Sequence, residues 1–487
     1  MSHPDMSSLK RRMRWLGLSL LSICLLITIL LPENRPVHAA PLPTLKIRPL
    51  PAFARKYGMP CSSCHLGWPM LSPFGQAFKD NGYQMMNDRD APIYQAPAYW
   101  PVTFRITPIW HRESINRVNV DNDPTNPAAG QKEARITTHG FDWSGLDFHT
   151  GGTLAKNVSF YVLPSSDNTG AFHFETVFAR LDNLLGSSWL NVKLGKFELD
   201  NLLSEKRILT LTNESGVYQN YHFQPATEAG GFFHFGIGDN QVGLEWMGHS
   251  KDDRTRVSAS LLSSKDGAPG LTAGRSYDTF LAASQAFQFG SLGLQRIGGF
   301  AYIGQAPTYF QYTQGGAGIP GTGVGNKAFY RFGVIGQFYV HKFDFTPIYF
   351  HGQDSAFLGT LTPANQALPA GAHNPSWNGF LLETHYTYNP QILLINRYEA
   401  IRMSQQALPV DPTTTVFMPG VSTTVPSSDF GNLDLLTFGF RYYPFISSRA
   451  GFAFHNEFSI MRQRKLSPLT GSDLTSSSLL FGFDFAF

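Results

Sequence analysis

Charge is scarce in this chain of 487 residues: Asp, Glu, Lys and Arg make up 15% of it, against about 25% in an ordinary soluble domain. Long apolar runs are scarcer still. Only Trp15 to Leu31 is continuously apolar, and the mean hydropathy is −0.15. A polytopic helical membrane protein is therefore excluded, because each span needs about 20 apolar residues. The net charge is +3 and no basic stripe is visible, so we expect no nucleic-acid partner.

Aromatic residues and glycine are plentiful. The chain holds 40 Phe and 46 Gly, and 42% of its residues are hydrophobic, which is enough apolar surface to argue against disorder. An aromatic-rich, glycine-rich and charge-poor composition predicts a mainly β protein, and a transmembrane β-barrel is the first candidate.

The N-terminus has the pattern of an export signal. Four basic residues within Lys10–Arg14 precede the apolar run, and Val37-His38-Ala39-Ala40 follows it. A basic region, an apolar region and an A-x-A-like site predict a secretory signal peptide over residues 1–40; a retained membrane anchor is the alternative. Cys24 lies inside the signal, so the exported chain keeps two cysteines, Cys61 and Cys64.

These two cysteines belong to Cys61-Ser62-Ser63-Cys64-His65, a C-x-x-C-H pattern typical of c-type haem attachment. Two thiols at this spacing can form thioethers with one porphyrin edge, and the following histidine can bind the iron as an axial ligand. The pattern predicts one covalent haem c held by Cys61, Cys64 and His65. A structural disulfide, a thioredoxin-like pair and half of a zinc site are the alternatives.

The sixth ligand of the haem iron is open at this point. A methionine opposite the histidine would raise the haem potential, although any one of these methionines can equally be a gap-filling apolar residue. The candidates are Met70, Met85 and Met86, with Met59, His111, His139 and His149 as further ones.

Residues 99–487 alternate between apolar and polar positions, which predicts strands. Apolar side chains occupy one face and charged side chains the other, as with Phe332 beside Arg331. A soluble sandwich alternates in the same way, but aromatic apolar faces and charges on the opposite face favour a barrel in lipid. The terminal stretch Phe481–Phe487 also resembles the C-terminal assembly signal of bacterial outer-membrane proteins. At roughly 24 residues per strand and connection we expect about 16 strands, with 14 or 18 as alternatives. The alternating runs are Val242–Trp246, Tyr330–Val340, Phe343–Tyr349, Leu436–Tyr442 and Phe452–Phe458.

Three connections, Gln305 to Lys327, Gly359 to Asn378 and Ser404 to Asp429, carry two charges at most. They are either flexible surface loops or an adaptation to an acidic exterior.

The segment 41–98 is too short to bury an adequate core by itself. A 16-stranded barrel leaves a lumen, so we expect this partly helical, haem-bearing segment to plug it. Electrons cannot cross an apolar layer of ~30 Å in one useful step, and one haem inside the pore would shorten their path.

The haem segment resembles the outer-membrane cytochrome–porin fusions of iron-oxidising bacteria. The resemblance implies a monohaem c-type cytochrome joined to a porin-like barrel, with Cys61 and Cys64 bound to haem and His65 as an axial ligand. It also implies Fe(II) oxidation at the cell surface and electron delivery to a periplasmic c-type cytochrome or cupredoxin. It identifies no iron-binding residue. The residues that carry it are Pro51–Arg55, Gly58, Cys61–His65, Pro69, Leu71, Phe74-Gly75, Phe78-Lys79 and Gly82-Tyr83.

Three functions follow for a barrel in the outer membrane of a Gram-negative bacterium, in contact with its lipid. The first is an Fe(II):cytochrome c oxidoreductase with no catalytic side chain, because the haem does the chemistry. The second is an electron conduit for another donor or acceptor, and the third a transport porin with a structural haem plug. Glu245, Glu383 and Glu399 are either stepping points for iron or ordinary lumen lining.

Overall fold

The fold is taken from a computed structural model. It describes residues 52–67, 70–85, 90, 92, 102–121, 131–166, 170–199, 240–263, 277–307, 312–314, 317–319, 326–354, 376–403, 415–418, 421–424, 431–445, 452–465 and 473–486. The expected signal peptide and Met86 lie outside these residues. No helix within the described ranges is long and apolar enough to cross a membrane.

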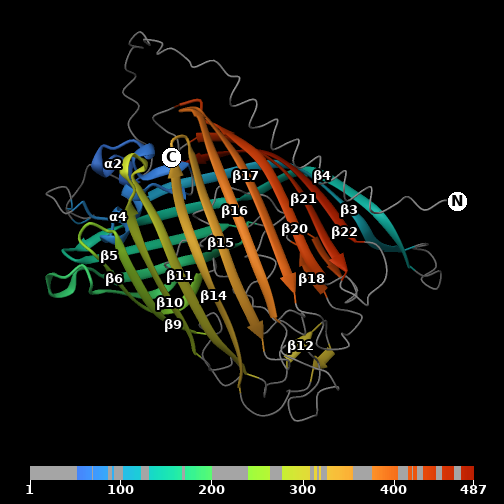
Figure 1. Ribbon diagram of the computed structural model, residues 1–487, viewed down its shortest axis with the longest axis horizontal. Coiled ribbons are helices and arrows are strands. Elements are labelled where there is room, and N and C mark those ends of the chain that lie inside the picture. The colour runs from blue at the N-terminus through green and yellow to red at the C-terminus, as the bar shows by residue number, and fades with distance from the viewer. Residues whose placement is uncertain are drawn as a thin grey trace, which may run out of the picture. The chain divides into compact units, whose positions relative to one another are not determined.

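Sixteen antiparallel strands form one closed barrel (Figure 1). Consecutive barrel strands pair around the ring, and β22 pairs with β3 to close it. The expected number of strands is therefore confirmed. The strands are β3 Val102–Asp121, β4 Gln131–Ala155, β5 Val158–Ser166, β6 Phe172–Leu181, β7 Asn191–Glu198, β8 Asn240–His249, β9 Thr255–Ser263, β10 Tyr277–Gln288, β11 Leu294–Pro307, β14 Asn326–Val340, β15 Phe343–Asp354, β16 Ser376–Asn389, β17 Ile392–Met403, β20 Gly431–Tyr442, β21 Phe452–Lys465 and β22 Leu474–Ala486.

The two ends of the barrel differ in their connections. Tight turns join the strands at one end, which we call the short-turn end. They include Lys156-Asn157 and His341-Lys342, where Asn157 and His341 adopt positive φ, as two-residue hairpin turns require. The one-turn helices η3 Leu184–Gly186 and η6 Gly290–Leu292 lie in two other turns of this end.

Longer connections join the strands at the opposite, long-loop end. The three charge-poor connections belong there and lie largely outside the described residues, so their acidic-exterior interpretation stays a prediction. Three of their bounding residues lie on described strands: Gln305 on β11, Lys327 on β14 and Asn378 on β16. Two short hairpins lie within two of these connections, β12 Tyr312–Gln314 with β13 Ala317–Ile319, and β18 Thr415–Met418 with β19 Val421–Thr424.

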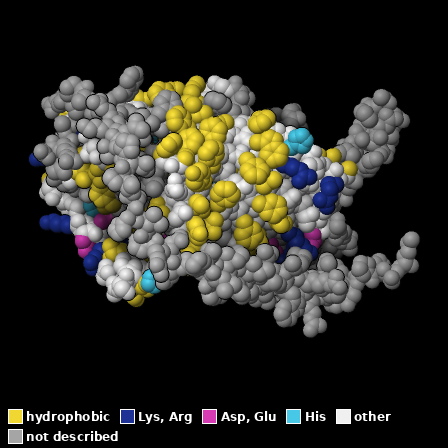
Figure 2. All heavy atoms as spheres, turned by 90° about the horizontal axis from the view of Figure 1, so that it is seen from above, with side chains coloured by type: hydrophobic (Ala, Val, Ile, Leu, Met, Phe, Trp, Pro, Cys, Tyr) yellow, Lys and Arg dark blue, Asp and Glu magenta, His cyan; other side chains and the backbone are white. Residues whose placement is uncertain are grey.

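Along the middle of the barrel strands, apolar side chains face outward and most charged side chains face inward. On β14, Phe332 and Val334 are 46% and 55% exposed, whereas Arg331, the residue before Phe332, is 1% exposed. On β8, Leu244 and Trp246 are likewise exposed around the fully buried Glu245. Figure 2 shows the apolar side chains gathered in a band across the outer wall. A soluble sandwich would bury this face, so the burial pattern is that of a barrel whose outer wall faces lipid.

The N-terminal segment is partly helical, as expected. Helix α4 begins where the Ser72 hydroxyl accepts a hydrogen bond from Gly75 N at 3.1 Å, with Pro73 in the first turn; both are favoured at helix starts. It ends before Gly82, which has φ +75°. The elements are α2 Ala52–Tyr57, α3 Cys61–Cys64, β1 His65–Gly67, β2 Met70–Leu71 and α4 Pro73–Asp80.

Candidate functional site

Helix α3 is a single turn that carries both cysteines of the haem motif. Cys61 and Cys64 are one helical turn apart, which places them on the same face of the helix. Cys61 is buried and Cys64 half-buried. The chain leaves the helix at His65, which is extended with φ −122° and pairs with Leu71 in the small β1–β2 sheet.

The start of α4 fixes the position of this turn. Ser72 N donates to Cys64 O at 2.8 Å, and the Ser72 hydroxyl donates to Ser63 O at 2.9 Å. Gly75 packs directly against the same peptide: an added Cβ would overlap Cys64 O and lie 2.8 Å from its carbonyl carbon. Glycine at position 75 is therefore a condition for the close approach of α4 to the haem motif.

The donor set fits a c-type haem. Two cysteines on one helix face, followed directly by a histidine, are the groups that covalent attachment and axial ligation need. A zinc site would need further ligands nearby, and the described residues contain no group of three or more His, Cys, Asp or Glu side chains able to hold a metal ion. Cys61 and Cys64 would hold the porphyrin, and His65 would bind its iron.

Burial makes Cys64 a weak acid. Loss of solvent raises the pKa of the Cys64 thiol to about 11, and the nearby Cys61 adds to the shift. Because the thiolate is the reactive form, we expect slow iodoacetamide alkylation of Cys64 at pH 7 in protein isolated without haem. The rate should rise steadily to about pH 11. Peptide mass spectrometry across this pH range measures it; a plateau near pH 8 would contradict the prediction.

The methionines named as sixth-ligand candidates lie in two different apolar clusters. Met70 is buried beside the inward-facing Leu393, Ile395 and Tyr443 of the barrel region. Met85 and Met59 pack instead against the cluster that contains Tyr57. The structure thus separates Met70 from Met59 and Met85, and which of them approaches the iron stays a prediction.

The three candidate histidines of the barrel also lie apart. His111 on β3 is 3.3 Å from Glu113, and the exposed His139 on β4 lies near Trp110. His149 Nδ1 is 2.6 Å from the hydroxyl of Tyr161, and Tyr161 stacks on Tyr83 of the N-terminal segment. Of the three histidines, His149 is thus linked to the haem segment, through Tyr161 and Tyr83.

An aromatic cluster attaches the segment to the inner wall. Tyr83 stacks on Phe53 at 5.2 Å and on Tyr161 of β5 at 5.8 Å. Phe78 meets Phe53 and Tyr57 edge to face at 5.2 and 5.3 Å. Each such pair adds about 0.5–1.5 kcal/mol beyond the area it buries, so these rings hold α2, α4 and the barrel wall together.

A buried ion pair lies directly under this cluster. Arg180 Nε pairs with Asp182, and both side chains are almost fully buried. Arg180 Nη2 also donates to Asp80 O at the end of α4, at 3.0 Å. A Cβ on Gly82 would lie 2.5 Å from Asp182 Cγ, so the glycine after α4 allows the backbone to reach this pair.

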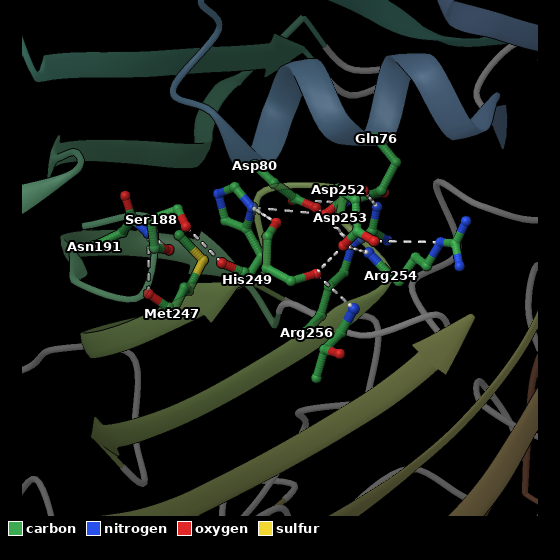
Figure 3. A network of polar contacts seen from close by, with 12 residues as sticks. Gln76, Asp80, Ser188, Asn191, Met247, His249, Asp252, Asp253, Arg254 and Arg256 are labelled. Atoms are coloured by element: carbon green, nitrogen blue, oxygen red, sulfur yellow. Dashed lines mark hydrogen bonds and ion pairs between the residues drawn. The ribbon is translucent and has the colours of Figure 1, made fainter. Parts of the chain in front are cut away.

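A second contact joins α4 to the turn between β8 and β9 (Figure 3). Asp80 Oδ1 accepts from Gln76 Nε2 at 2.8 Å, and Asp80 Oδ2 is 2.8 Å from Arg256 Nε. Arg256 also pairs with Asp253. Burial raises the pKa of Asp253, and Asp80 adds to this, while Arg256 opposes it. We call Gln76, Asp80, Asp253 and Arg256 the α4 latch.

A cavity of about 150 Å³ lies beside the α4 latch. Residues 70–73 and 76–77 line one side, and Arg256, Arg296 and Tyr339 line the other. Cys61, Cys64 and His65 do not line it, although Leu71 and Ser72, which contact the haem motif, do.

The acidic residues of the inner wall are paired. Glu245 binds Lys193, and Glu399 binds Arg397. Glu383 is 2.7 Å from His385, which also lies 2.5 Å from Asp344. Because each of the three candidate stepping points is buried and has a cationic or imidazole partner, the structure supports a role in holding the wall together.

Sequence reasoning missed the α4 latch and the Arg180–Asp182 pair. A local pattern was available for the pair: Arg180 is on β6 and Asp182 directly follows it, so the alternation of the strand places both on the inward side. No local pattern indicates that Asp80 meets Arg256. The sequence also did not predict that the haem motif lies at the short-turn end of the barrel, because this position depends on these two contacts.

The fold and site together define a closed antiparallel barrel with a lipid-facing outer wall and a cysteine-containing segment at its short-turn end. No protein-family model matches the chain, and no curated protein matches its sequence. Solved structures similar to it include an anion-selective porin from Comamonas acidovorans, with 9% identity, 79% of this chain and 99% of that chain covered, and a TM-score of 0.46. The outer-membrane channel DcaP of Acinetobacter baumannii is similar at 10% identity, 79% and 97% coverage, and a TM-score of 0.44.

OprB of Pseudomonas putida is similar at 9% identity, with 87% of this chain and 99% of that chain covered and a TM-score of 0.42. Because these identities and TM-scores are low, the fold and the proposals below depend on the strand pairing and the burial of side chains in this chain, and not on these similarities.

Proposed function

We propose that this chain is an outer-membrane β-barrel that carries one covalent haem c near its periplasmic end. It passes single electrons from an external donor, Fe(II), to a periplasmic c-type cytochrome or cupredoxin. Each Fe(II) becomes Fe(III), and each electron released reduces one acceptor centre. The observation that carries the proposal is the C-x-x-C-H turn, whose two cysteines share one helix face, in a segment anchored to the inner wall of a lipid-facing barrel.

The orientation of the barrel supports delivery to the periplasm. Bacterial outer-membrane barrels have short periplasmic turns and longer external loops, so the short-turn end faces the periplasm. The α4 latch ties the segment to a turn of that end. Exposed cations of the same end are Lys156, Lys251, Arg254 and Lys342, with Asp252 as an exposed anion. This basic rim suits an acceptor with an acidic surface.

The residues of the segment have separate tasks. Cys61 and Cys64 would hold the porphyrin, and His65 would bind its iron. Ser72 and Gly75 hold the motif against α4, and the aromatic cluster excludes water on the barrel side. When bound, haem c takes up and releases one electron, and the protein sets its potential and access.

A transport porin with a structural haem plug is the second candidate. The 16-strand circumference, with charged residues on the inner wall, favours it, because barrels of this size can enclose an aqueous channel. The buried, paired state of Glu245, Glu383 and Glu399 counts against a wide aqueous channel at their positions, because a water-filled channel would expose its lining.

Anaerobic mixing of the oxidised holoprotein with Fe(II) tests the proposal. We expect rapid appearance of the reduced haem bands. The double variant Cys61→Ala/Cys64→Ala should retain no covalent haem, because both thioether positions are lost, and it should give no Fe(II)-dependent signal. Mass spectrometry of the denatured chain measures attachment.

Heat-modifiable migration on gels shows in parallel that the variant barrel is folded. Reduction by dithionite but not by Fe(II) would refute iron as the donor and leave a conduit for another donor. Solute flux through the holoprotein in liposomes, without reduction by any external donor, would favour the transport porin. Absence of covalent haem from the wild-type protein would refute the proposal as a whole.

A further inference from the structure

Three arginines gather on the outward face of β17 and β21 at the long-loop end. Arg402 Nη2 is 2.5 Å from Asp434 Oδ1, and Arg464 pairs with the other oxygen of Asp434. Arg462 Nε is 2.7 Å from Asp473 Oδ2. We call Arg402, Arg462, Arg464, Asp434 and Asp473 the arginine patch.

The cations of this patch are more exposed than its anions. The side chains of Arg402, Arg462 and Arg464 are 41%, 38% and 46% exposed, against 17% for Asp434 and 26% for Asp473. The carboxylates therefore lie beneath the guanidinium groups and hold them in place. Three cations and two anions leave the patch with one net positive charge.

The patch lies at the edge of the apolar band. On β21, Phe458 and Ile460 are exposed outward-facing residues, and Arg462 and Arg464 occupy the next two outward positions toward the long loops. On β17, Tyr398 is an exposed outward-facing residue, and Arg402 lies two outward positions further toward the long loops. One outward position corresponds to about 7 Å along a strand. Figure 2 shows basic and acidic side chains beside the apolar band.

The position of the arginine patch at the edge of the apolar band corresponds to the level of the lipid headgroups. Residues that follow the apolar band of a transmembrane barrel lie at the membrane–water interface. With the short turns in the periplasm, the arginine patch faces the external leaflet, which in Gram-negative bacteria consists of phosphorylated glycolipid. Guanidinium groups bind phosphate through paired hydrogen bonds, and basic clusters at this height bind lipid headgroups.

We propose that the arginine patch binds a phosphate group of an external-leaflet glycolipid. The proposal depends on the outer-membrane location proposed above and is independent of the haem. Arg402 and Arg464 provide the principal contacts, because Asp434 holds both guanidinium groups together, and Arg462 adds a neighbouring charge.

The test uses the full-length holoprotein in detergent and measures lipid binding by native mass spectrometry. The probes are diphosphoryl lipid A, the same lipid with both phosphates removed, and inorganic phosphate. We expect the wild-type protein to bind the phosphorylated lipid at least tenfold more tightly than the dephosphorylated form. The variant Arg402→Gln/Arg464→Gln/Asp434→Asn should lose at least tenfold of this affinity, and its neutralised Asp434 avoids an uncompensated carboxylate.

A matched control, Lys251→Gln/Arg254→Gln, removes two cations at the short-turn end and should bind lipid A as the wild type does. Equal binding of the two lipids, or unchanged binding by the patch variant, would overturn the proposal. Inorganic phosphate that binds as tightly as lipid A would overturn the lipid as ligand and indicate free phosphate. Cell fractionation is scored separately, so absence from the outer membrane refutes the proposed location rather than phosphate binding.

Discussion

Replacement of Gly75 by alanine is expected to cause a several-fold loss of covalent haem. The new methyl group would overlap the backbone of Cys64, and a backbone peptide cannot rotate away as a flexible side chain can. Overpacking of this kind costs about 1–3 kcal/mol, and about 1.4 kcal/mol changes a folded-to-unfolded ratio tenfold. The cysteine turn would therefore spend much more time away from its position on α4. Haem absorbance per chain, with the attached mass of the tryptic peptide, measures the loss.

Gly140→Ala is the matched control. Gly140 lies on β4, where an added Cβ meets no heavy atom within 4 Å, so its haem content should equal that of the wild type. Full haem content in the Gly75→Ala protein, with an unchanged unfolding midpoint, would show that the contact between α4 and Cys64 does not position the motif.

The barrel could be predicted from the sequence because its determinants are local. The alternation of Arg331 with Phe332 is visible in two consecutive letters, and the structure confirms that they face opposite sides. The terminal alternation predicted a final strand, and β22 is the strand that closes the ring. Composition and alternation therefore predicted the class of fold, whereas the spacing indicated about 16 strands and left 14 and 18 open until the pairing showed 16.

The arrangement of the haem segment could be predicted only in part, because it depends on pairs that are distant in sequence. Gly75 and Gly82 are among the residues that carry the family resemblance. The groups that require glycine there, the Cys64 peptide and the Asp182 carboxylate, are visible only in the folded chain. Met70 looks like the other methionines in sequence, yet it packs with Tyr443 near the other end of the chain. No periodicity reports such a neighbour, so the sequence leaves the sixth ligand open.

The second large effect is expected from Arg180→Met. This change leaves the buried Asp182 without its cation and removes the hydrogen bond to Asp80 O. Loss of one partner of a buried ion pair costs about 3–5 kcal/mol. Because Arg180 joins β6 to the end of α4, we expect much of this cost to appear as release of the N-terminal segment. A shift of 3 kcal/mol raises the released fraction more than about 100-fold. Limited trypsin digestion at Lys56 and Lys79, followed over time, measures that fraction.

Two controls separate pairing from general damage. Arg180→Met/Asp182→Asn removes the buried charge together with its partner, and it should recover much of the resistance to trypsin. Arg254→Gln breaks the exposed pair with Asp252, 3.3 Å away at the same end of the barrel, and should digest as the wild type does, because exposed pairs contribute little. If Arg180→Met resists trypsin as well as Arg254→Gln does, the Arg180–Asp182 pair stabilises only the barrel wall, and the segment is held by its aromatic cluster and the α4 latch.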